Sequence, residues 1–227
     1  MRAVRPPAAF APFEDLAADL LRHLPDGGDG SHDRAHLHRV WRNARAIRAE
    51  EGGDPEILAA ACLLHDGVAV EKTSPLRPRA SRLAAARADD LLARLGWPEA
   101  RRAAVRHAIE AHSFSAGIPP ETIEAKILQD ADRLDAIGAL GIARCFYTAG
   151  RTGAALYEAA DPAARGRPLD DGRFALDHFA TKLLRLADGF QTAAGRRMAR
   201  ARHARMAHFL AGFHEEIGGP EDETAGP

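Results

Sequence analysis

The ten residues from Pro55 to Leu64, PEILAAACLL, are apolar on nearly every side of a helix. A helix without a polar face must be covered by neighbouring elements, so this segment belongs at the centre of a fold. Asp54-Pro55 starts this helix, and Gly52 and Gly53 end the preceding helical pattern. The remaining chain must therefore supply amphipathic helices that pack around this one.

Helical periodicity does recur on both sides of the central segment. No stretch alternates with the period of two that is typical of a strand. The second helix is capped at Ser31 or Asp33 and runs to about residue 51. The other expected helices cover about residues 12–24, 55–66, 80–95, 98–112, 121–147, 173–188 and 191–216, where 121–147 is one long helix or two abutting ones. The sequence predicts an all-α helical bundle of about eight or nine helices.

The length of the chain favours one domain. With 227 residues, 46% of them hydrophobic, the chain can bury a substantial core. We expect a single helical domain over 1–217, with its core motifs in about 31–150 and its C-terminal helices in about 173–216. Residues 150–172 are punctuated by Gly, Pro and Asp and predict a long exposed connection, and 218–227 predict a flexible tail.

Charge and composition restrict the partners. The 31 basic and 32 acidic residues give a formal net charge of -1, which argues against stable nucleic-acid binding and against an anionic membrane surface. No apolar run approaches the ~20 residues of a membrane helix, and the start lacks a signal-peptide core, so we expect a cytoplasmic protein. Cys62 and Cys145 are expected to be buried free thiols. The sequence does not distinguish a monomer from a homodimer.

An adjacent His65-Asp66 pair ends the central apolar helix. Two ionisable groups at the end of a buried helix are costly unless they pair with other groups or bind a metal ion. Imidazole and carboxylate together suit divalent manganese, iron, magnesium, nickel or zinc. The pair alone is weak evidence, because a buried structural ion pair explains it equally well.

Further metal-ligating residue types occur at helical spacing elsewhere in the chain: His32 and His36, then His107 and His112, then Asp130, Asp132 and Asp135. The five-residue spacing of His107 and His112 turns them about 140° apart on a regular helix. Both face one site only if the helix ends near His112. His32 and Asp33 are equally well explained as capping groups.

Several segments together resemble the HD-domain phosphohydrolases of the bacterial YedJ and YpgQ type: HDRAHLHRV, EGGDPEILAAACLLHD, KTSPLRPRAS, HAIEAHSFSAG and AKILQDADRLDAIGALGIARCFYTAG. The resemblance covers most of the chain and implies an HD-fold helical bundle. It also implies a divalent metal ion, with Mn²⁺ favoured over Mg²⁺, Ni²⁺, Fe²⁺ or Zn²⁺, held by His36, His65, Asp66 and Asp132. Of the three aspartates in QDADRLD, Asp132 matches the last ligand of the family; Asp130 and Asp135 are neighbours able to orient ligands or water.

The activity implied by this resemblance is hydrolysis of phosphorylated small molecules, with (deoxy)nucleoside triphosphates favoured and pyrophosphate released by a metal-activated water. Asp66, Asp132, His107 and His112 are the expected catalytic residues. Positive side chains follow the His-Asp pair or lie between aspartates, and we expect them to contact substrate phosphates: Lys72, Arg77, Arg79 and Arg133. Arg133 is equally a candidate partner for its flanking carboxylates. The general base is not identified, because the first acid after the pair is Glu71.

Other functions remain compatible with the same residues. A nucleotide-sensing HD module without turnover would keep the pocket, although degenerate modules usually lose a ligand and all four ligand positions are filled here. A 5'-nucleotidase or another phosphoesterase would use the same metal chemistry on a different bond. An HD oxygenase would need two irons and additional histidine ligands, for which His107 and His112 are the candidates.

Overall fold

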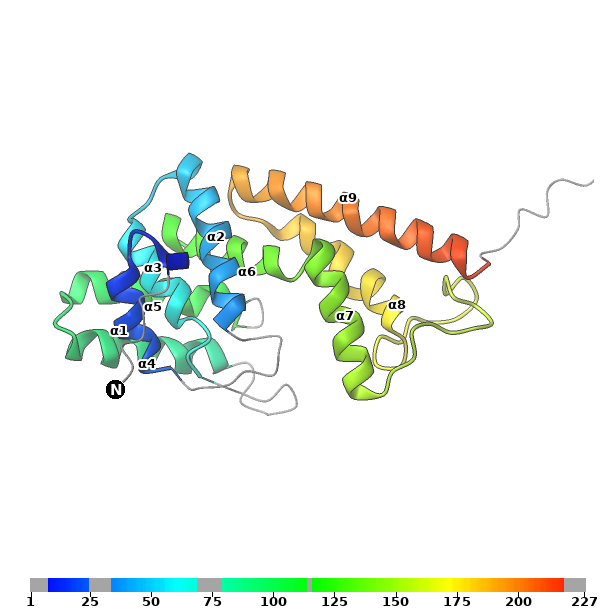
Figure 1. The fold of residues 1–227 in the computed structure, drawn as a ribbon, viewed down its shortest axis with the longest axis horizontal. Coiled ribbons are helices and arrows are strands. Elements are labelled where there is room, and N and C mark those ends of the chain that lie inside the picture. The colour runs from blue at the N-terminus through cyan, green and yellow to red at the C-terminus, as the bar shows by residue number, and fades with distance from the viewer. Residues whose placement is uncertain (1–7, 25–33, 69–78, 114–115, 219–227) are drawn as a thin grey trace, which may run out of the picture. The chain divides into compact units, whose positions relative to one another are not determined.

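A computed structural model describes residues 8–24, 34–68, 79–113 and 116–218 (Figure 1). The chain forms two compact units. The first consists of Met1–Arg133 with Gln191–Gly195, and the second of Leu134–Phe190 with Arg196–Pro227. The chain therefore leaves the first unit within one helix, returns to it for five residues, and leaves it again.

The described residues contain helices and no β-strand, which confirms the predicted all-α architecture. The first unit holds the 3₁₀ turn η1 (Ala8–Phe10) and helices α1 (Glu14–Leu21), α2 (Arg34–Glu51), α3 (Pro55–Leu64), α4 (Ala80–Arg94), α5 (Glu99–His112) and most of α6 (Ile123–Asp135). The second unit holds α7 (Gly138–Thr152), α8 (Ala175–His178), the π-helical turn η4 (Phe179–Leu183), the 3₁₀ turn η5 (Leu184–Gly189) and most of α9 (Ala193–Glu216).

Helix α3 lies at the centre of the first unit, as its apolar sequence predicted. All residues from Leu58 to Leu64 are buried, and α1, α2, α4 and α5 pack around the helix. Its start is fixed by Asp54, whose carboxylate accepts hydrogen bonds from the backbone N–H groups of Glu56 and Ile57. The C-terminal end of α3 therefore lies in the interior of the first unit.

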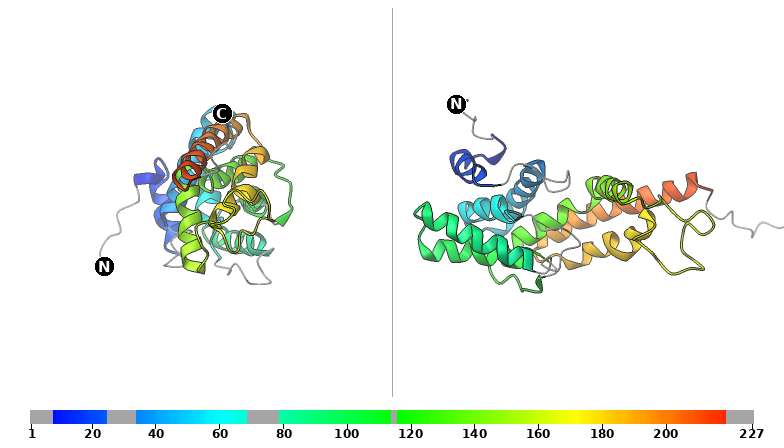
Figure 2. Two further views of the ribbon diagram at one scale, coloured as in Figure 1. Left: turned by 90° about the vertical axis from the view of Figure 1, so that its right-hand side faces the viewer. Right: turned by 90° about the horizontal axis from the view of Figure 1, so that it is seen from below.

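Helices α4 and α5 form an antiparallel pair that lies side by side in the views of Figures 1 and 2. Asp89 on α4 forms ion pairs with Arg102 and Arg106 on α5, which fixes the register of the two helices. This register brings the start of α4 next to the end of α5, where His112 lies. The pair therefore supports the C-terminal end of α5.

The segment predicted as one long helix or two abutting ones is two helices, α6 and α7. The break falls at Ala136 and Ile137, and Gly138 begins α7 with a φ of 76°. A side chain at Gly138 would crowd the aliphatic part of Arg202, which crosses it and donates a hydrogen bond to the carbonyl of Leu134. Helix α7 then continues to Thr152, beyond the predicted end at 147.

The second unit has an aromatic core of its own, formed by Phe146, Phe179, Phe209 and Phe213. Phe146 lies 5.9–6.1 Å, centroid to centroid, from each of the other three rings. Phe209 and Phe213 project from α9, so this helix is amphipathic and buries its aromatic side. The C-terminal helix therefore contributes two of the four rings of this cluster.

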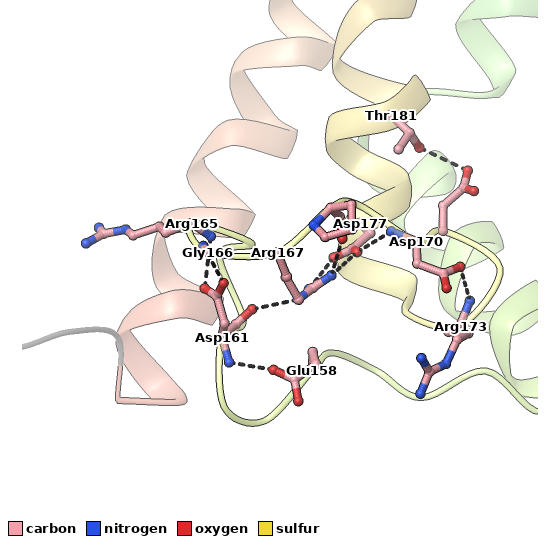
Figure 3. A network of polar contacts seen from close by, with 11 residues as sticks. Glu158, Asp161, Arg165, Gly166, Arg167, Asp170, Arg173, Asp177 and Thr181 are labelled. Carbon is pink, nitrogen blue, oxygen red and sulfur yellow. Dashed lines mark hydrogen bonds and ion pairs between the residues drawn. The ribbon is translucent and has the colours of Figure 1, made fainter.

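The long connection before α8 is held by a polar network (Figure 3). The Arg167 guanidinium donates to both carboxylate oxygens of Asp177, at 2.5 and 2.8 Å, and Asp177 is almost fully buried. The carboxylate of Asp161 accepts from the backbone N–H groups of Arg165 and Gly166. The sequence predicts a long exposed connection here. In the structure, hydrogen bonds from and to charged side chains hold this connection.

Both cysteines are free and buried, as predicted. Burial raises the pKa of the Cys62 thiol far above its usual value and that of Cys145 to about 11. Both therefore stay protonated at neutral pH. Within the described ranges, every helix is too short or too polar to cross a bilayer.

Candidate metal centre

His65 caps the C-terminal end of α3 and is almost fully buried. Its Nδ1 lies 2.9 Å from the carbonyl oxygen of Cys62, one turn earlier in the same helix. A carbonyl oxygen only accepts hydrogen bonds, so Nδ1 carries the proton and donates it. The neutral ring therefore presents an unprotonated Nε2 to the interior of the unit.

His36, in the first turn of α2, is equally buried, and its Nε2 lies 3.2 Å from the Nε2 of His65. Burial lowers the pKa of His65, and the nearby rings of His112 and His36 lower it further. Asp66 and Asp132 act in the opposite direction but less strongly than burial. At neutral pH His65 is therefore an uncharged nitrogen ligand and not the positive half of an ion pair.

Two carboxylates complete the cluster. Asp66 Oδ2 lies 3.4 Å from the Nε2 of His36 and 3.6 Å from that of His65. Asp132 Oδ1, from the last turns of α6, lies 3.5 and 3.8 Å from the same two nitrogens. The side chains of Asp66 and Asp132 stay 32% and 29% exposed, whereas the imidazoles are sealed in the core. The cluster is thus closed on its nitrogen side and open on its oxygen side.

The distances among His36, His65 and Asp66 fit one divalent ion, and Asp132 offers a second carboxylate next to both imidazoles. Ligands about 2.1 Å from an ion lie about 3.0 Å apart at right angles and about 3.4 Å apart at the tetrahedral angle. The separations of 3.2–3.8 Å are close to this range. The ligand atoms of His36, His65 and Asp66 also lie within 4.8 Å of one another. Two nitrogens and two carboxylate oxygens are a donor set for a borderline divalent metal ion, with room for water or substrate on the exposed side.

His112, the last residue of α5, lies beside this cluster. Its ring packs edge-on against that of His65, with centroids 5.0 Å apart and planes at 85°. Its Nδ1 donates to the carbonyl of Ile109 at 2.6 Å, the same arrangement that fixes His65. Helix α5 ends at His112, which is largely buried next to His65.

Other predicted neighbours are engaged elsewhere. The Nε2 of His107 accepts a hydrogen bond from the backbone N–H of Glu121, in the segment before α6. Asp130 accepts hydrogen bonds from the segment that begins α9. Asp135 is fully buried and pairs with Arg144 of α7. The structure therefore brings His112, and Asp132 among the three aspartates, to the two imidazoles.

The predicted phosphate-binding residues divide into three groups. Lys72 and Arg77 lie outside the described residues, as do His32 and Asp33. Arg79 is exposed at the start of α4. Arg133 follows Asp132 and is half-buried; burial lowers its pKa, while Asp130 and Asp132 raise it. Of these four predicted phosphate-binding residues, Arg133 is the one that the structure describes next to a proposed ligand.

Two supports of the cluster have no motif that would have revealed them. Arg87 on α4 donates to the carbonyl oxygens of Gly67, at 3.0 Å, and His23, at 2.7 Å, and so holds the turn that follows Asp66. Asn43 on α2 donates to the carbonyl of Ala131 at 3.1 Å. Both are long-range contacts of ordinary residue types, which sequence periodicity does not predict.

An all-helical fold with a buried His-His pair, an adjoining aspartate and a late aspartate on a helix defines the class of HD-domain phosphohydrolases. The HD domain family model matches residues 34–137, which include all four proposed ligands. The chain is also 36% identical to YpgQ of Bacillus subtilis (strain 168) over 206 residues, covering 89% of this chain and 92% of that protein.

Solved structures agree with this assignment. The structure of Bacillus subtilis YpgQ in complex with ADP superposes with a TM-score of 0.65 at 35% identity, covering 83% of this chain and 91% of YpgQ. An HD-superfamily hydrolase from Bacillus thuringiensis gives a TM-score of 0.69 at 31% identity, covering 94% and 100%. The chain belongs to the HD family and is a metal-dependent phosphohydrolase of that superfamily.

Proposed function

We propose that this enzyme hydrolyses (deoxy)nucleoside triphosphates to the monophosphate and pyrophosphate, with Mn²⁺ bound by His36, His65, Asp66 and Asp132. The observation that carries the proposal is the convergence of two buried Nε2 atoms, 3.2 Å apart, with two part-exposed carboxylates that each place an oxygen 3.4–3.8 Å from both nitrogens. A structural ion pair would not need two converging imidazole nitrogens with an open face.

The chain's own residues keep this site ready for a metal ion. Hydrogen bonds to helix carbonyls fix the protons of His65 and His112 on Nδ1, so their Nε2 lone pairs point away from their own helices. Asp66 and Asp132 supply negative charge on the solvent side. The bound ion would polarise a phosphate oxygen and lower the pKa of a water molecule toward neutrality.

In the proposed reaction a water oxygen forms a bond to the α-phosphorus, and the bond from that phosphorus to its bridging oxygen breaks. Pyrophosphate leaves with the bridging oxygen, and the proton of the water passes to a base. His112 is our candidate for that base, because its ring packs against that of His65 and its Nδ1 is already bonded to the carbonyl of Ile109. Arg133, Arg79, Lys72 and Arg77 would neutralise the phosphates.

The nucleotide class is supported by one relative: YpgQ of Bacillus subtilis was crystallised in complex with ADP. ADP does not report which bond is broken. A 5'-nucleotidase acting on monophosphates, or a sensor that binds nucleotide without turnover, uses the same pocket. Product identity therefore decides among them.

The test uses metal-stripped full-length protein, added Mn²⁺ and a panel of ribo- and deoxynucleoside mono-, di- and triphosphates, with products separated by anion-exchange chromatography. We expect triphosphates to yield monophosphate and pyrophosphate. Asp66→Asn and Asp132→Asn should each lower turnover by at least about a hundredfold, since even outer-shell partners of metal ligands cost 10–100-fold. Asp135→Asn is the matched control, because Asp135 pairs with Arg144 instead.

The outcomes separate the candidates. Nucleoside and phosphate from monophosphates would replace the proposal with a nucleotidase. Tight nucleotide binding without products would favour a sensor. Activity that disappears under nitrogen, with oxygen consumed in air, would identify an oxygenase. Equal losses in Asp132→Asn and Asp135→Asn would show that the effect is structural and remove the assignment of the ligand.

A further inference from the structure

Asp130 lies two residues before the proposed ligand Asp132 and is fully buried. Its Oδ1 accepts a hydrogen bond from the N–H of Gln191 at 2.8 Å, and its Oδ2 accepts from the N–H and the hydroxyl of Thr192 at 2.8 and 2.7 Å. The Thr192 hydroxyl in turn accepts from the N–H of Gly195 and caps α9. One carboxylate of α6 is therefore saturated by the segment that begins α9.

The same segment reaches the end of α5. Gln191 Nε2 donates to Gln129 Oε1 at 2.9 Å, and Gln129 Nε2 donates to the carbonyl of Ala111 at 2.7 Å. Ala111 immediately precedes His112, whose ring contacts that of His65. A continuous chain of hydrogen bonds thus joins α9, α6 and α5 behind the metal centre.

On the other side of α6, Asn43 holds the carbonyl of Ala131. Asn43 lies two turns after His36 on α2, so this bond ties the helix that carries one proposed ligand to the helix that carries another. The three residues that precede Asp132 are each bonded to a different part of the first unit. Side-chain hydrogen bonds from three directions therefore meet on the turn of α6 that precedes Asp132.

We propose that the α6 clamp, defined as Gln129, Asp130, Gln191 and Thr192, is a positioning device that sets the rotation of α6 and thereby the place of Asp132 at the metal centre. Asp130 projects about 200° around α6 from Asp132, so its hydrogen bonds hold the opposite side of this helix. None of the clamp residues is among the four proposed metal ligands. The inference rests on the metal centre of the proposed function and not on the choice of substrate.

The geometry shows why such a device matters. A carboxylate oxygen about 5 Å from the axis of α6 moves by about 0.9 Å when the helix rotates by about 10°. Metal–ligand distances tolerate only about 0.2 Å. Asp132 lies in the last turn of α6, whose carbonyl groups have no partners within the helix, so this turn needs support from other parts of the first unit. The clamp supplies that support from the returning segment Gln191–Gly195.

The experiment measures Mn²⁺ binding to metal-stripped full-length protein by the EPR signal of free Mn²⁺, with no nucleotide present. Thr192→Val removes the hydroxyl but keeps the shape of the side chain, and Thr192→Ser restores the hydroxyl. The matched control is Thr122→Val, because Thr122 Oγ1 accepts from the N–H of Ala125 and caps the other end of α6 without touching the clamp. Both Val variants lose one helix cap.

We expect Thr192→Val to raise the Kd for Mn²⁺ about tenfold, and Thr192→Ser and Thr122→Val to stay within about twofold of the wild type. The thermal midpoint should fall in both Val variants, and further in Thr192→Val, because this variant also removes a hydrogen bond to the buried Asp130 carboxylate. If Thr192→Val does not fold, Gln191→Ala serves instead: Gln191 is exposed, and its loss should raise the Kd about threefold.

Equal Kd values in Thr192→Val and the wild type, or equal increases in both Val variants, would overturn the proposal, as would a wild-type protein that binds no Mn²⁺. A different result would contradict the proposed function without contradicting the role of the clamp. Tight Mn²⁺ binding that depends on Thr192, without hydrolysis of any nucleotide, would refute the triphosphatase reaction and leave the positioning role of the clamp in place.

Discussion

Replacing Asp132 by Asn separates a metal centre from a structural ion pair, because the two interpretations predict changes of different size in the stability of the metal-free protein. Burial lowers the pKa of His65, so this imidazole adds no positive charge between Asp132 and Asp66 at neutral pH. Both carboxylate oxygens lie within 3.5 Å of the His36 Nε2, so they are at most about 7 Å apart. Their repulsion at that distance is about 0.6 kcal/mol in water and about 2.4 kcal/mol at an effective dielectric of 20.

Asp132→Asn removes that repulsion and also the attraction of Asp132 to Arg133, so the two effects offset each other. We expect the free energy of unfolding of the metal-free protein to change by less than about 1 kcal/mol. With Mn²⁺ at a hundred times Kd, the wild type should gain about 2.7 kcal/mol. At about 2–4 °C per kcal/mol this is a rise of about 5–10 °C in midpoint, and the variant should lose it.

The assay is thermal unfolding followed by circular dichroism, with chelator and with Mn²⁺, for the wild type, Asp132→Asn and the control Asp135→Asn. Asp135 is buried and paired with Arg144, so the control should lower the metal-free midpoint but keep the Mn²⁺ shift. A loss of about 3–5 kcal/mol in metal-free Asp132→Asn, the usual cost of breaking a buried ion pair, would refute the reasoning. So would an unchanged Mn²⁺ shift in that variant.

Three further expectations follow from the described contacts. His112→Gln should lower kcat about a hundredfold in single-turnover assays and cost clearly more than His107→Gln, because only His112 packs on the cluster; equal losses would contradict this. Hydrogen bonds from Arg167 lower the pKa of Asp177, so the stability they add is complete above the ordinary carboxyl pKa of 3.8 and is lost as the pH falls through the folded value. The difference in urea midpoint between the wild type and Arg167→Met should therefore be constant from pH 7 to 5 and narrow below 3.8; a difference that widens in acid would exclude this ion pair as its source. Gly195→Ala should both lower the thermal midpoint and weaken Mn²⁺ binding, since an added Cβ overlaps a carboxylate oxygen of the α6 clamp; a normal Kd would show that the clamp yields without moving the metal centre.

The sequence predicts the helical elements well, because each has a strong local signal. The apolar segment 55–64 has to be central, and Asp54 and the glycines before it mark its start, as the structure confirms. The sequence does not decide whether 121–147 forms one helix or two, since Gly138 lies within a continuous apolar pattern. In the structure Gly138 adopts a φ of 76° and lies against the side chain of Arg202, a residue far along the chain.

The roles of the three aspartates in QDADRLD show a second limit. Spacing places them about 200° and 300° apart on α6, but it does not show which neighbours each one meets. Asp130 contacts the start of α9 and Asp135 contacts α7, and both partners depend on tertiary structure. The family resemblance singled out Asp132, whereas the supporting residues Asn43 and Thr192 carry no recognisable motif because their role lies in a long-range hydrogen bond.

The metal centre is formed where helices end, and this accounts for its chemistry. His65 caps α3, His112 is the last residue of α5, and Asp132 lies in the last turn of α6. Helix C-termini leave carbonyl groups without helical partners and carry partial negative charge. The two histidines bond to carbonyls three residues back, which fixes their Nε2 atoms as acceptors, and the three helix ends together favour a cation. The same electrostatics disfavour a phosphate, so an anionic substrate must be neutralised by the bound ion and by basic side chains outside the four ligands. Metal binding and substrate choice are therefore carried by different parts of the chain, which is why the ligands identify the family while the substrate has to be found by experiment.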